Sequence, residues 1–176
     1  MSLHTQIRIV RDDLSGEAIR ELLRLHLRGM HENSPPGTAF ALDLTGLQTP
    51  EVTVWSGWVG SRIADIGALK VLDVRCAEVK SMRTHPDFLR QGIARQILEH
   101  IIRVAQSEGL RRLSLETGTG AAFEPALALY RQRGFVNGPA FADYPSNSSF
   151  NQFMHLDLPD RSAGSLGSWD SLRSRP

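Results

Sequence analysis

The sequence predicts an α/β (α+β) domain in which helices cover both faces of a mixed β-sheet. Three observations lead to this fold class. Strand-like segments dominate the first half of the chain after one helix, and a strand, a long helix and a strand then follow in residues 77–117. A crossover helix of this kind joins parallel neighbouring strands. The last strands lie close together in the sequence, as in a hairpin, so the complete sheet should be mixed.

Size and composition predict one ordinary globular domain. The chain has 176 residues, of which 41% are hydrophobic, enough to form a buried core. We assign residues 1–158 to this domain. Residues 159–176 are rich in Asp, Arg, Ser and Gly and have no apolar period, which predicts a flexible C-terminal tail.

Charge and cysteine content exclude several classes of protein. Lys and Arg number 20 against 19 Asp and Glu, and a net charge of +1 argues against a nucleic-acid partner. The single cysteine, Cys76, excludes an intrachain disulfide and a Cys-rich zinc site, and the histidines lack the spacing of a metal pair. We therefore expect no metal.

The beginning of the chain and its hydropathy predict a cytoplasmic protein. Residues 1–5 lack the charged and then apolar pattern of a secretory signal. No run approaches the roughly 18 apolar residues of a membrane-spanning helix, so we expect no membrane partner. The sequence leaves a homodimer open.

The first half of the chain reads as strands around one helix. Ile7 and Ile9 alternate with polar residues, as in a strand. Ser15 is a candidate cap for a helix that Gly29 should end, and its apolar stripe includes His26, expected as a core histidine with satisfied hydrogen bonds. A short helical turn in 40–47 precedes strands expected at 52–55, 63–72 and 77–84, with turns on both sides of 58–59.

The second half contains the clearest helix. Apolar residues recur every four positions from Ile93 to Ala105, and Gly109 ends the pattern. A strand at 112–117 follows. Pro125 suits the first turn of another helix, which Gly134 stops. The last strands are expected to begin at 135–136 and to span 150–158.

A possible anion site lies where the strand ending at Thr84 gives way to the long helix. The first N–H groups of a helix are unpaired and the dipole there is positive, so the helix start favours phosphate or pyrophosphate. Gly92 allows close backbone approach, and Arg90 and Arg95 add positive charge. A plain connecting turn is the alternative. The segment is neither a Walker A loop nor G-x-G-x-x-G.

This segment resembles the GNAT acetyltransferases. Their motif is (Gln/Arg)-x-x-Gly-x-(Gly/Ala) at the start of a long helix, and Gly92-Ile93-Ala94 supplies its second part. Leu89 occupies the Gln/Arg position, which is a departure from the motif. The family binds the coenzyme A pyrophosphate there largely through backbone N–H groups, so the departure affects the motif more than the expected chemistry.

Two further patterns support the resemblance. The family's later Ala-x-x-Leu-Tyr-x-x-x-Gly-Phe matches here with Ala126, Leu129, Tyr130, Gly134 and Phe135. The segments 80–83, 115–118 and 153–154 are similar to a bacterial subgroup of uncharacterised GNAT proteins, which does not identify a substrate. The resemblance extends from about residue 7 to residue 158.

The resemblance implies an N-acetyltransferase that moves acetyl from the cosubstrate acetyl-CoA to a primary amine of a small molecule or peptide, by direct attack. It also implies a GNAT-like sheet partly split after the 77–84 strand, with the pantetheine in the gap. The Met82 backbone would hold the thioester carbonyl, and Thr84 would contact the pantetheine. The residues implied in coenzyme binding are Met82, Arg83, Thr84, Leu89, Arg90, Gln91, Gly92, Ile93, Ala94 and Arg95.

Three residues are candidates for proton transfer. Tyr130 is implied as the general acid that protonates the leaving thiolate; the alternative is a core tyrosine. Glu78, fourteen residues before Gly92, corresponds to the general base of some family members; the alternative is an ion pair with Lys80 on the same strand face. Glu116 ends a parallel strand, where ligands commonly bind, and could be the base or orient the amine; otherwise it is a solvated carboxylate.

Two other functions fit the same fold. A non-catalytic acyl-CoA-binding or sensor module would keep the phosphate loop without a base or an acid. A protein acetyltransferase, acting on an N-terminus or a lysine, would need an open groove. The acceptor amine should contact the least diagnostic segments, 26–36, 118–124 and 141–149.

Overall fold

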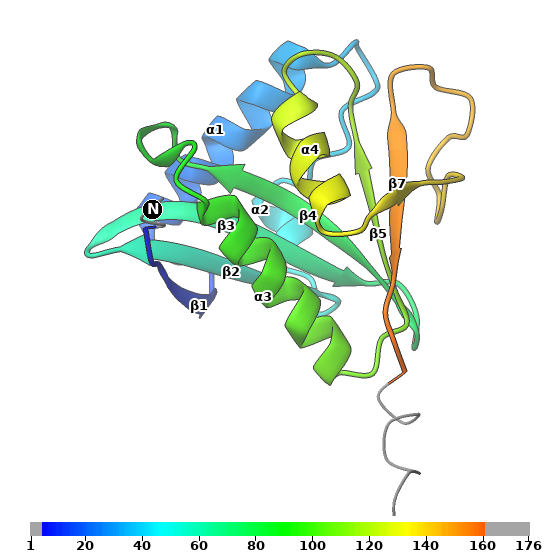
Figure 1. Ribbon diagram of the computed structural model, residues 1–176. Helices are drawn as coiled ribbons and strands as arrows, with labels where there is room; N and C mark the ends of the chain where they lie inside the picture. Colours follow the sequence, from blue (N-terminus) through cyan, green and yellow to red (C-terminus); the bar gives the residue numbers. More distant parts are fainter. Residues whose placement is uncertain (1–4, 161–176) are drawn as a thin grey trace, which may run out of the picture.

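The computed structural model describes residues 5–160, which contain a mixed, seven-stranded sheet (Figure 1). The strand order is β1-β2-β3-β4-β5-β7-β6. Only β4 and β5 pair in parallel, and every other described pair is antiparallel. The strands are β1 (Arg8–Asp12), β2 (Val52–Val59), β3 (Arg62–Val71), β4 (Cys76–Thr84), β5 (Arg112–Thr117), β6 (Val136–Asn137) and β7 (Gln152–Asp157).

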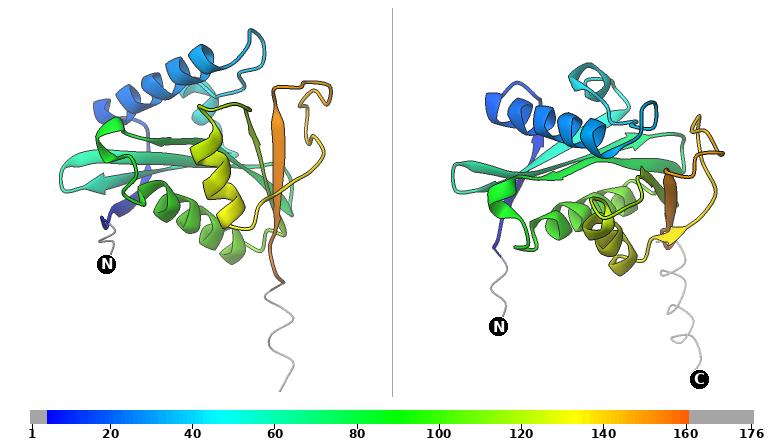
Figure 2. Two further views of the ribbon diagram at one scale, coloured as in Figure 1. Left: turned by 45° about the horizontal axis from the view of Figure 1, so that its top comes forward. Right: turned by 90° about the horizontal axis from the view of Figure 1, so that it is seen from above.

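Helices lie on both faces of the sheet, as predicted. Figure 2 shows α1 and α2 above the sheet and α3 and α4 below it. Within residues 5–160, none of the helices is long and apolar enough to span a membrane. The helices are α1 (Glu17–Asn33), α2 (Leu44–Leu47), α3 (Ile93–Ser107) and α4 (Glu124–Gln132), with a 3-10 turn at Pro86–Phe88.

Each helical layer has its own core. The predicted stripe of α3 packs with β5 and α4, and its Ile97 and Ile101 are fully buried. The stripe of α1, including Ile19 and Leu22, packs on the opposite sheet face against Ile66. Because each helix contributes one apolar stripe, both faces of the sheet are sealed, which explains its long buried central strands.

Some expected boundaries are wrong. Gly16 rather than Ser15 caps α1, because the Ser15 hydroxyl instead donates to Asp13 Oδ1 at 2.6 Å. Gly29 does not end this helix, which continues to Asn33 shortly before two prolines. The turn expected at Gly57 is absent, and β2 continues through this residue. The structure has a register shift between Gly57 and Trp58 instead. Most of the predicted C-terminal tail, 161–176, lies outside the described residues.

The sheet opens between its two parallel strands. β4 and β5 pair through only three residue pairs, the last between Glu78 and Ser114. β5 then stays paired with β7 to its end, while β4 continues along β3, so the two parallel strands diverge (Figure 1). In the described chain, no strand pairs with the β5-facing edge of residues 79–84. This opening confirms the predicted split.

A β-bulge in β4 decides which side chains face the opening. Lys80 pairs with Ala68 and Arg83 with Ile66, so Ser81 and Met82 together oppose Gly67. Ser81 has φ of 55°. Because of the extra residue, the side chains of β4 after the bulge alternate again in register with those of β3. Lys80 and Arg83 therefore share the α1 face although they are three residues apart, since their partners Ala68 and Ile66 both belong to the α1-side core.

The bulge predicts a stability effect at Gly67. A methyl group on this residue would lie 2.6 Å from Ile97 Cγ2 and 2.8 Å from Met82 Sδ. We expect Gly67→Ala to destabilise the protein by about 1–3 kcal/mol through overpacking. Urea unfolding measures this, with Gly16→Ala as the control because a methyl group there meets nothing within 4 Å. Equal unfolding midpoints for Gly67→Ala and the wild type would contradict the packing.

Candidate active site

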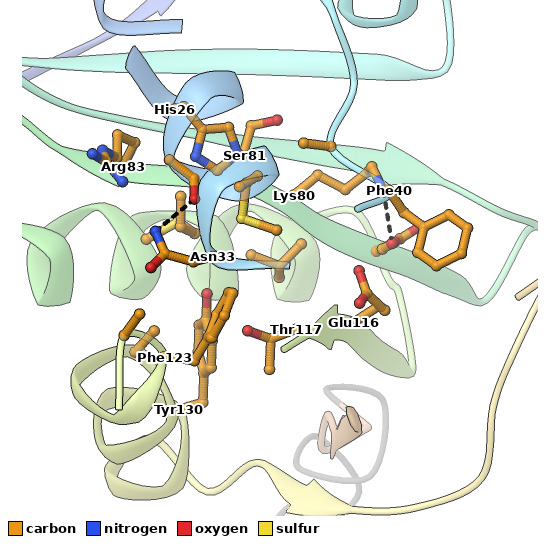
Figure 3. A pocket seen from close by; sticks show the side chains of 18 residues that line it. His26, Asn33, Phe40, Lys80, Ser81, Arg83, Glu116, Thr117, Phe123 and Tyr130 are labelled. Atoms are coloured by element: carbon orange, nitrogen blue, oxygen red, sulfur yellow. Dashed lines mark hydrogen bonds and ion pairs between the residues drawn. The ribbon is translucent and has the colours of Figure 1, made fainter. Parts of the chain in front are cut away.

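A cleft occupies the place where β4 and β5 diverge (Figure 3). One wall comes from the C-terminal half of α1 and residues 40–41, and the other from α4 and the residues just before it. β4 from Glu78 to Arg83 forms its floor, and the end of β5 closes one side. The cleft thus reaches both the α1 and the α4 side of the sheet at its opening.

Five of the predicted site residues line this cleft: Tyr130, Glu78, Glu116, Met82 and Arg83. They come from three separate elements, β4, β5 and α4, and the split sheet brings them together. The remaining predicted residues, Thr84 and 89–95, are not among the residues that line the cleft; they lie at the end of β4 and the beginning of α3.

Glu78 is held in a closed polar network. It is 3% exposed, and its Oε1 lies 3.0 Å from Lys80 Nζ. Lys80 Nζ also donates to the Tyr144 hydroxyl at 2.7 Å, and that hydroxyl donates to the same Oε1 of Glu78. Burial, together with the adjacent Glu78 carboxylate, raises the pKa of Tyr144. The ion pair that the sequence offered as the alternative role of Glu78 is therefore present.

Glu116 is less constrained. Its Oε1 accepts one hydrogen bond from Asn151 Nδ2 at 2.6 Å, and the same Nδ2 donates to the Thr38 carbonyl at 2.9 Å. Burial raises the pKa of Glu116, and the nearby Glu78 charge adds to this, while Asn151 and Lys80 act in the opposite direction. A half-buried carboxyl group with a raised pKa is a better proton acceptor than one held in an ion pair.

Tyr130 packs in the core, as one of its two expected roles requires, and it also lines the cleft. Its ring is 7% exposed and packs 5.8 Å from the Phe135 ring, centroid to centroid. Its hydroxyl points into the cleft in Figure 3, and it has no hydrogen-bond partner in residues 5–160. Burial raises the pKa of Tyr130, and the Asp65 and Glu116 charges add to this. The phenol is therefore protonated at neutral pH and able to donate.

The loop before α3 contains two residues in the left-handed region and leads into a helix without a side-chain cap. Arg90 and Gly92 have φ of 59° and 74°, and Gly92 is the N-cap residue of α3 and supplies no side-chain cap. The first N–H groups of α3 therefore depend on solvent or a ligand. Leu89 is 54% exposed, and Arg95 pairs with Glu99 at 2.8 Å.

His26 lies on the α1 wall of the cleft. It is 7% exposed and makes no hydrogen bond within the described residues, so the expected satisfied core histidine is wrong. Burial lowers the pKa of His26 to about 4, and the charges of Arg83 and Lys80 contribute. The imidazole is therefore neutral at neutral pH. His26 differs from the expectation because the last turns of α1 extend beyond the sealed core and face the split sheet.

Sequence reasoning missed the side chains that long-range contacts bring to the site. Tyr144 and Asn151 reach Glu78 and Glu116 from the segment between β6 and β7, 66 and 35 residues away in sequence. The sequence analysis expected segment 141–149 to contact the acceptor, but it named no individual residue of this segment. Ser81 had no local signal, because a bulge depends on the partner strand.

A buried carboxyl group supports the end of β4. Asp65 on β3 is fully buried, and its Oδ2 accepts from Thr84 Oγ1 at 2.5 Å. Its Oδ1 has no partner among the described residues. Burial raises the pKa of Asp65 to about 7 against the effect of hydrogen bonds from Thr84 and the Ile66 backbone. Thr84, expected to contact pantetheine, is thus held by an uncommon buried acid.

Comparison with known proteins identifies the family. The model of the Acetyltransferase (GNAT) family matches residues 17–135. The uncharacterised N-acetyltransferase YedL of Escherichia coli strain K12 is 50% identical over 147 residues, which cover 84% of this chain and 92% of that protein. The chain therefore belongs to the GNAT family of acetyltransferases, as its motifs indicated.

Solved structures share the fold at low identity. A candidate acyl-CoA N-acyltransferase of Klebsiella pneumoniae aligns with a TM-score of 0.73 at 22% identity over 88% of this chain and 99% of that one. A GNAT family acetyltransferase of Elizabethkingia anophelis, solved with acetyl-CoA bound, aligns with a TM-score of 0.64 at 18% identity. This alignment covers 86% of this chain and 98% of that one. These likenesses confirm the predicted fold class.

Asp65 predicts a pH-dependent stability. The unfolded chain releases this proton near pH 3.8, whereas the native protein keeps it to about pH 7. Between these values the native state binds more protons, so the stability contributed by Asp65 falls as pH rises. We expect the difference in unfolding free energy between wild type and Asp65→Asn to change by up to about 1.4 kcal/mol per pH unit from pH 4 to 7. Urea unfolding across this range measures it, and parallel pH dependences would contradict the assignment.

Proposed function

We propose that this protein transfers an acetyl group from acetyl-CoA to a primary amine by direct attack. The observation that carries the proposal is that Tyr130 and Glu116, one protonated and one with a raised pKa, line the same cleft beside the bulged strand β4. Direct transfer needs these two groups: a base for the attacking ammonium and an acid for the leaving thiolate. Family membership supports the reaction class.

The coenzyme would enter along the free edge of β4. Backbone N–H and C=O groups of residues 79–84 lack a partner strand on that side, and the pantetheine amides can pair with such an edge. The pyrophosphate would lie at the beginning of α3, where the helix dipole and the unpaired N–H groups favour negative charge. The Met82 backbone would then hold the thioester carbonyl and stabilise the tetrahedral oxyanion.

Glu116 is the stronger candidate for the base. Glu78 is closed in by Lys80 and Tyr144, and its Oε1 accepts from both. Glu116 has one hydrogen bond and a raised pKa, and it lies at the end of β5 on the cleft. It can accept a proton from the amine directly or through one water. Glu78 and its partners would then hold the floor of the site in place.

Tyr130 would protonate the thiolate as coenzyme A leaves. Its hydroxyl faces the cleft, and its high pKa keeps the proton available. The leaving thiol has a pKa near ~8.5, so protonation contributes less here than it would for an alkoxide. We therefore expect a contribution at the low end of general acid catalysis.

The phosphate loop predicts a binding defect. Gly92→Asp places a negative charge and a β-carbon at a φ of 74° where the pyrophosphate should bind, and calorimetric titration should show at least about tenfold weaker coenzyme A binding. Gly109→Asp is the matched control, because Gly109 has φ of 78° at the other end of the same helix with nothing within 4 Å. Equal affinity of both folded variants for coenzyme A would refute the site.

The two proton-transfer roles predict different changes in the pH–rate profile. Glu116 must be ionised to accept a proton, so Glu116→Gln should lose the rise of the rate with pH, while Glu78→Gln keeps it. Tyr130→Phe keeps the ring packing and should lose at least about tenfold in turnover across the accessible pH range, because Tyr130 stays protonated throughout it. Thiol release from acetyl-CoA with one acceptor amine gives the profiles of these three variants.

The wild-type profile and the melting temperatures complete this experiment. Acetyl-CoA binding should be nearly unchanged in Tyr130→Phe. If turnover is intact and only the melting temperature falls, Tyr130 is a core residue and not the acid. If the wild type binds acetyl-CoA but releases no thiol with any amine, the protein is a binding module.

A further inference from the structure

We propose that the acceptor amine also carries a carboxylate, and that Arg83, together with Ser81 and His26, binds this carboxylate. This inference rests on the proposed acetyl transfer and names its substrate class, an amino acid or a similar small amino carboxylate. It is carried by a group of polar side chains on the α1 wall and the β4 floor of the cleft that lack partners in the described structure (Figure 3).

Arg83 is a half-buried cation without a counter-ion. The family resemblance implied Arg83 in coenzyme binding, but its side chain lies on the α1 face of β4. It forms no ion pair and no hydrogen bond within residues 5–160, and its Nε is buried without a partner. Burial lowers the pKa of Arg83, and Glu32 opposes this effect from beyond ion-pair distance. An arginine remains charged even so, and a partly buried charge without a partner costs stability. A site that tolerates this cost is suited to an anionic ligand.

Two further groups on the same side of the cleft as Arg83 have free hydrogen-bonding capacity. Ser81 is 9% exposed, and its Oγ has no partner. His26 is neutral and also makes no hydrogen bond among the described residues, so one of its ring nitrogens can donate. Figure 3 shows Arg83, His26 and Ser81 on the same side of the cleft, opposite Tyr130. Guanidinium, hydroxyl and imidazole together are donors that match the acceptor-only oxygens of a carboxylate.

Two features of the fold position the Arg83 side chain. The bulge at Ser81 turns Arg83 to the α1 face, and α1 carries a glycine at the point of contact. A methyl group on Gly29 would lie 3.0 Å from Arg83 Nη1 and 3.4 Å from Nη2, so Gly29 leaves room for the guanidinium against the helix. A planar guanidinium can form two parallel contacts with a planar carboxylate, which a lysine ammonium cannot.

The charges of the cleft are separated along β4. Lys80 is already engaged by Glu78 and Tyr144, so it does not compete for an anionic ligand. Arg83 lies on β4 beyond the last β4–β5 residue pair, whereas Glu116 lies at the end of β5. One end of the cleft thus attracts a carboxylate, and the Glu116 side attracts an ammonium group. A zwitterionic amine fits this polarity.

Turnover with matched amines tests the proposal. A panel of free amino acids, their carboxamides and the corresponding decarboxylated amines is assayed for thiol release from acetyl-CoA. We expect kcat/KM at least about tenfold higher for the acids than for the amides, because only the acids can form the charge-assisted contacts. Arg83→Gln should abolish this preference mainly through KM, and Arg83→Lys should restore part of it. Arg103→Gln removes the same charge from the exposed side of α3 and should change nothing.

A second measurement does not depend on turnover. Ligand-observed NMR of N-acetyl amino acids and N-acetyl amino amides, with the protein loaded with coenzyme A, compares the product pairs directly. We expect the carboxylates to bind the wild type better than the amides, and Arg83→Gln to lose this difference. The melting temperature of Arg83→Gln should be equal to or above that of the wild type, because an unpaired charge is removed; a merely structural arginine would lower it.

The outcomes separate this inference from the proposed function. Equal use of acids and amides, or a preference that survives in Arg83→Gln, overturns the carboxylate site while acetyl transfer stands. Arg83-dependent carboxylate binding without thiol release refutes the transferase function but keeps the site. Equal binding of carboxylates and amides, or no binding of either, overturns the inference.

Discussion

The early end of the parallel pairing between β4 and β5 is the constraint on which the site depends. After three residue pairs β5 remains with β7 and β4 remains with β3, so their facing edges separate. β3 pairs with β4, and β7 pairs with β5, over nearly the whole length of each strand. The other pairs of the sheet therefore remain intact although β4 and β5 separate. This separation creates both a free backbone edge and a cleft between the two helical layers.

The bulge in β4 determines which side chains lie on each face of this opening. Met82 lies on the α3 side, against Gly67, and Thr84 is held by Asp65 of β3. Lys80 and Arg83 lie on the α1 side. The proposed coenzyme edge and the proposed acceptor wall therefore belong to one strand, and a single extra residue sets their relation. Positioning both partners on one rigid strand favours direct transfer between them.

Local patterns were enough to predict the fold but not the details of the site. The period of α3, the glycine at its start and the spacing around Tyr130 predicted the crossover unit and the family correctly. Gly29 misled because a glycine within α1 makes room for Arg83 and does not end the helix. The free polar groups at Ser81 and His26 and the contacts of Tyr144 and Asn151 arise from strand register and from segments distant in sequence, which no local pattern encodes.

Amide hydrogen exchange with and without acetyl-CoA tests the central role of the split most directly. If the coenzyme occupies the free edge of β4, exchange should slow in residues 79–84 and in the first turn of α3, while β1 and β2 remain unchanged. Exchange that is unaffected by acetyl-CoA in residues 79–84, or protection confined to other parts of the sheet, would contradict the account.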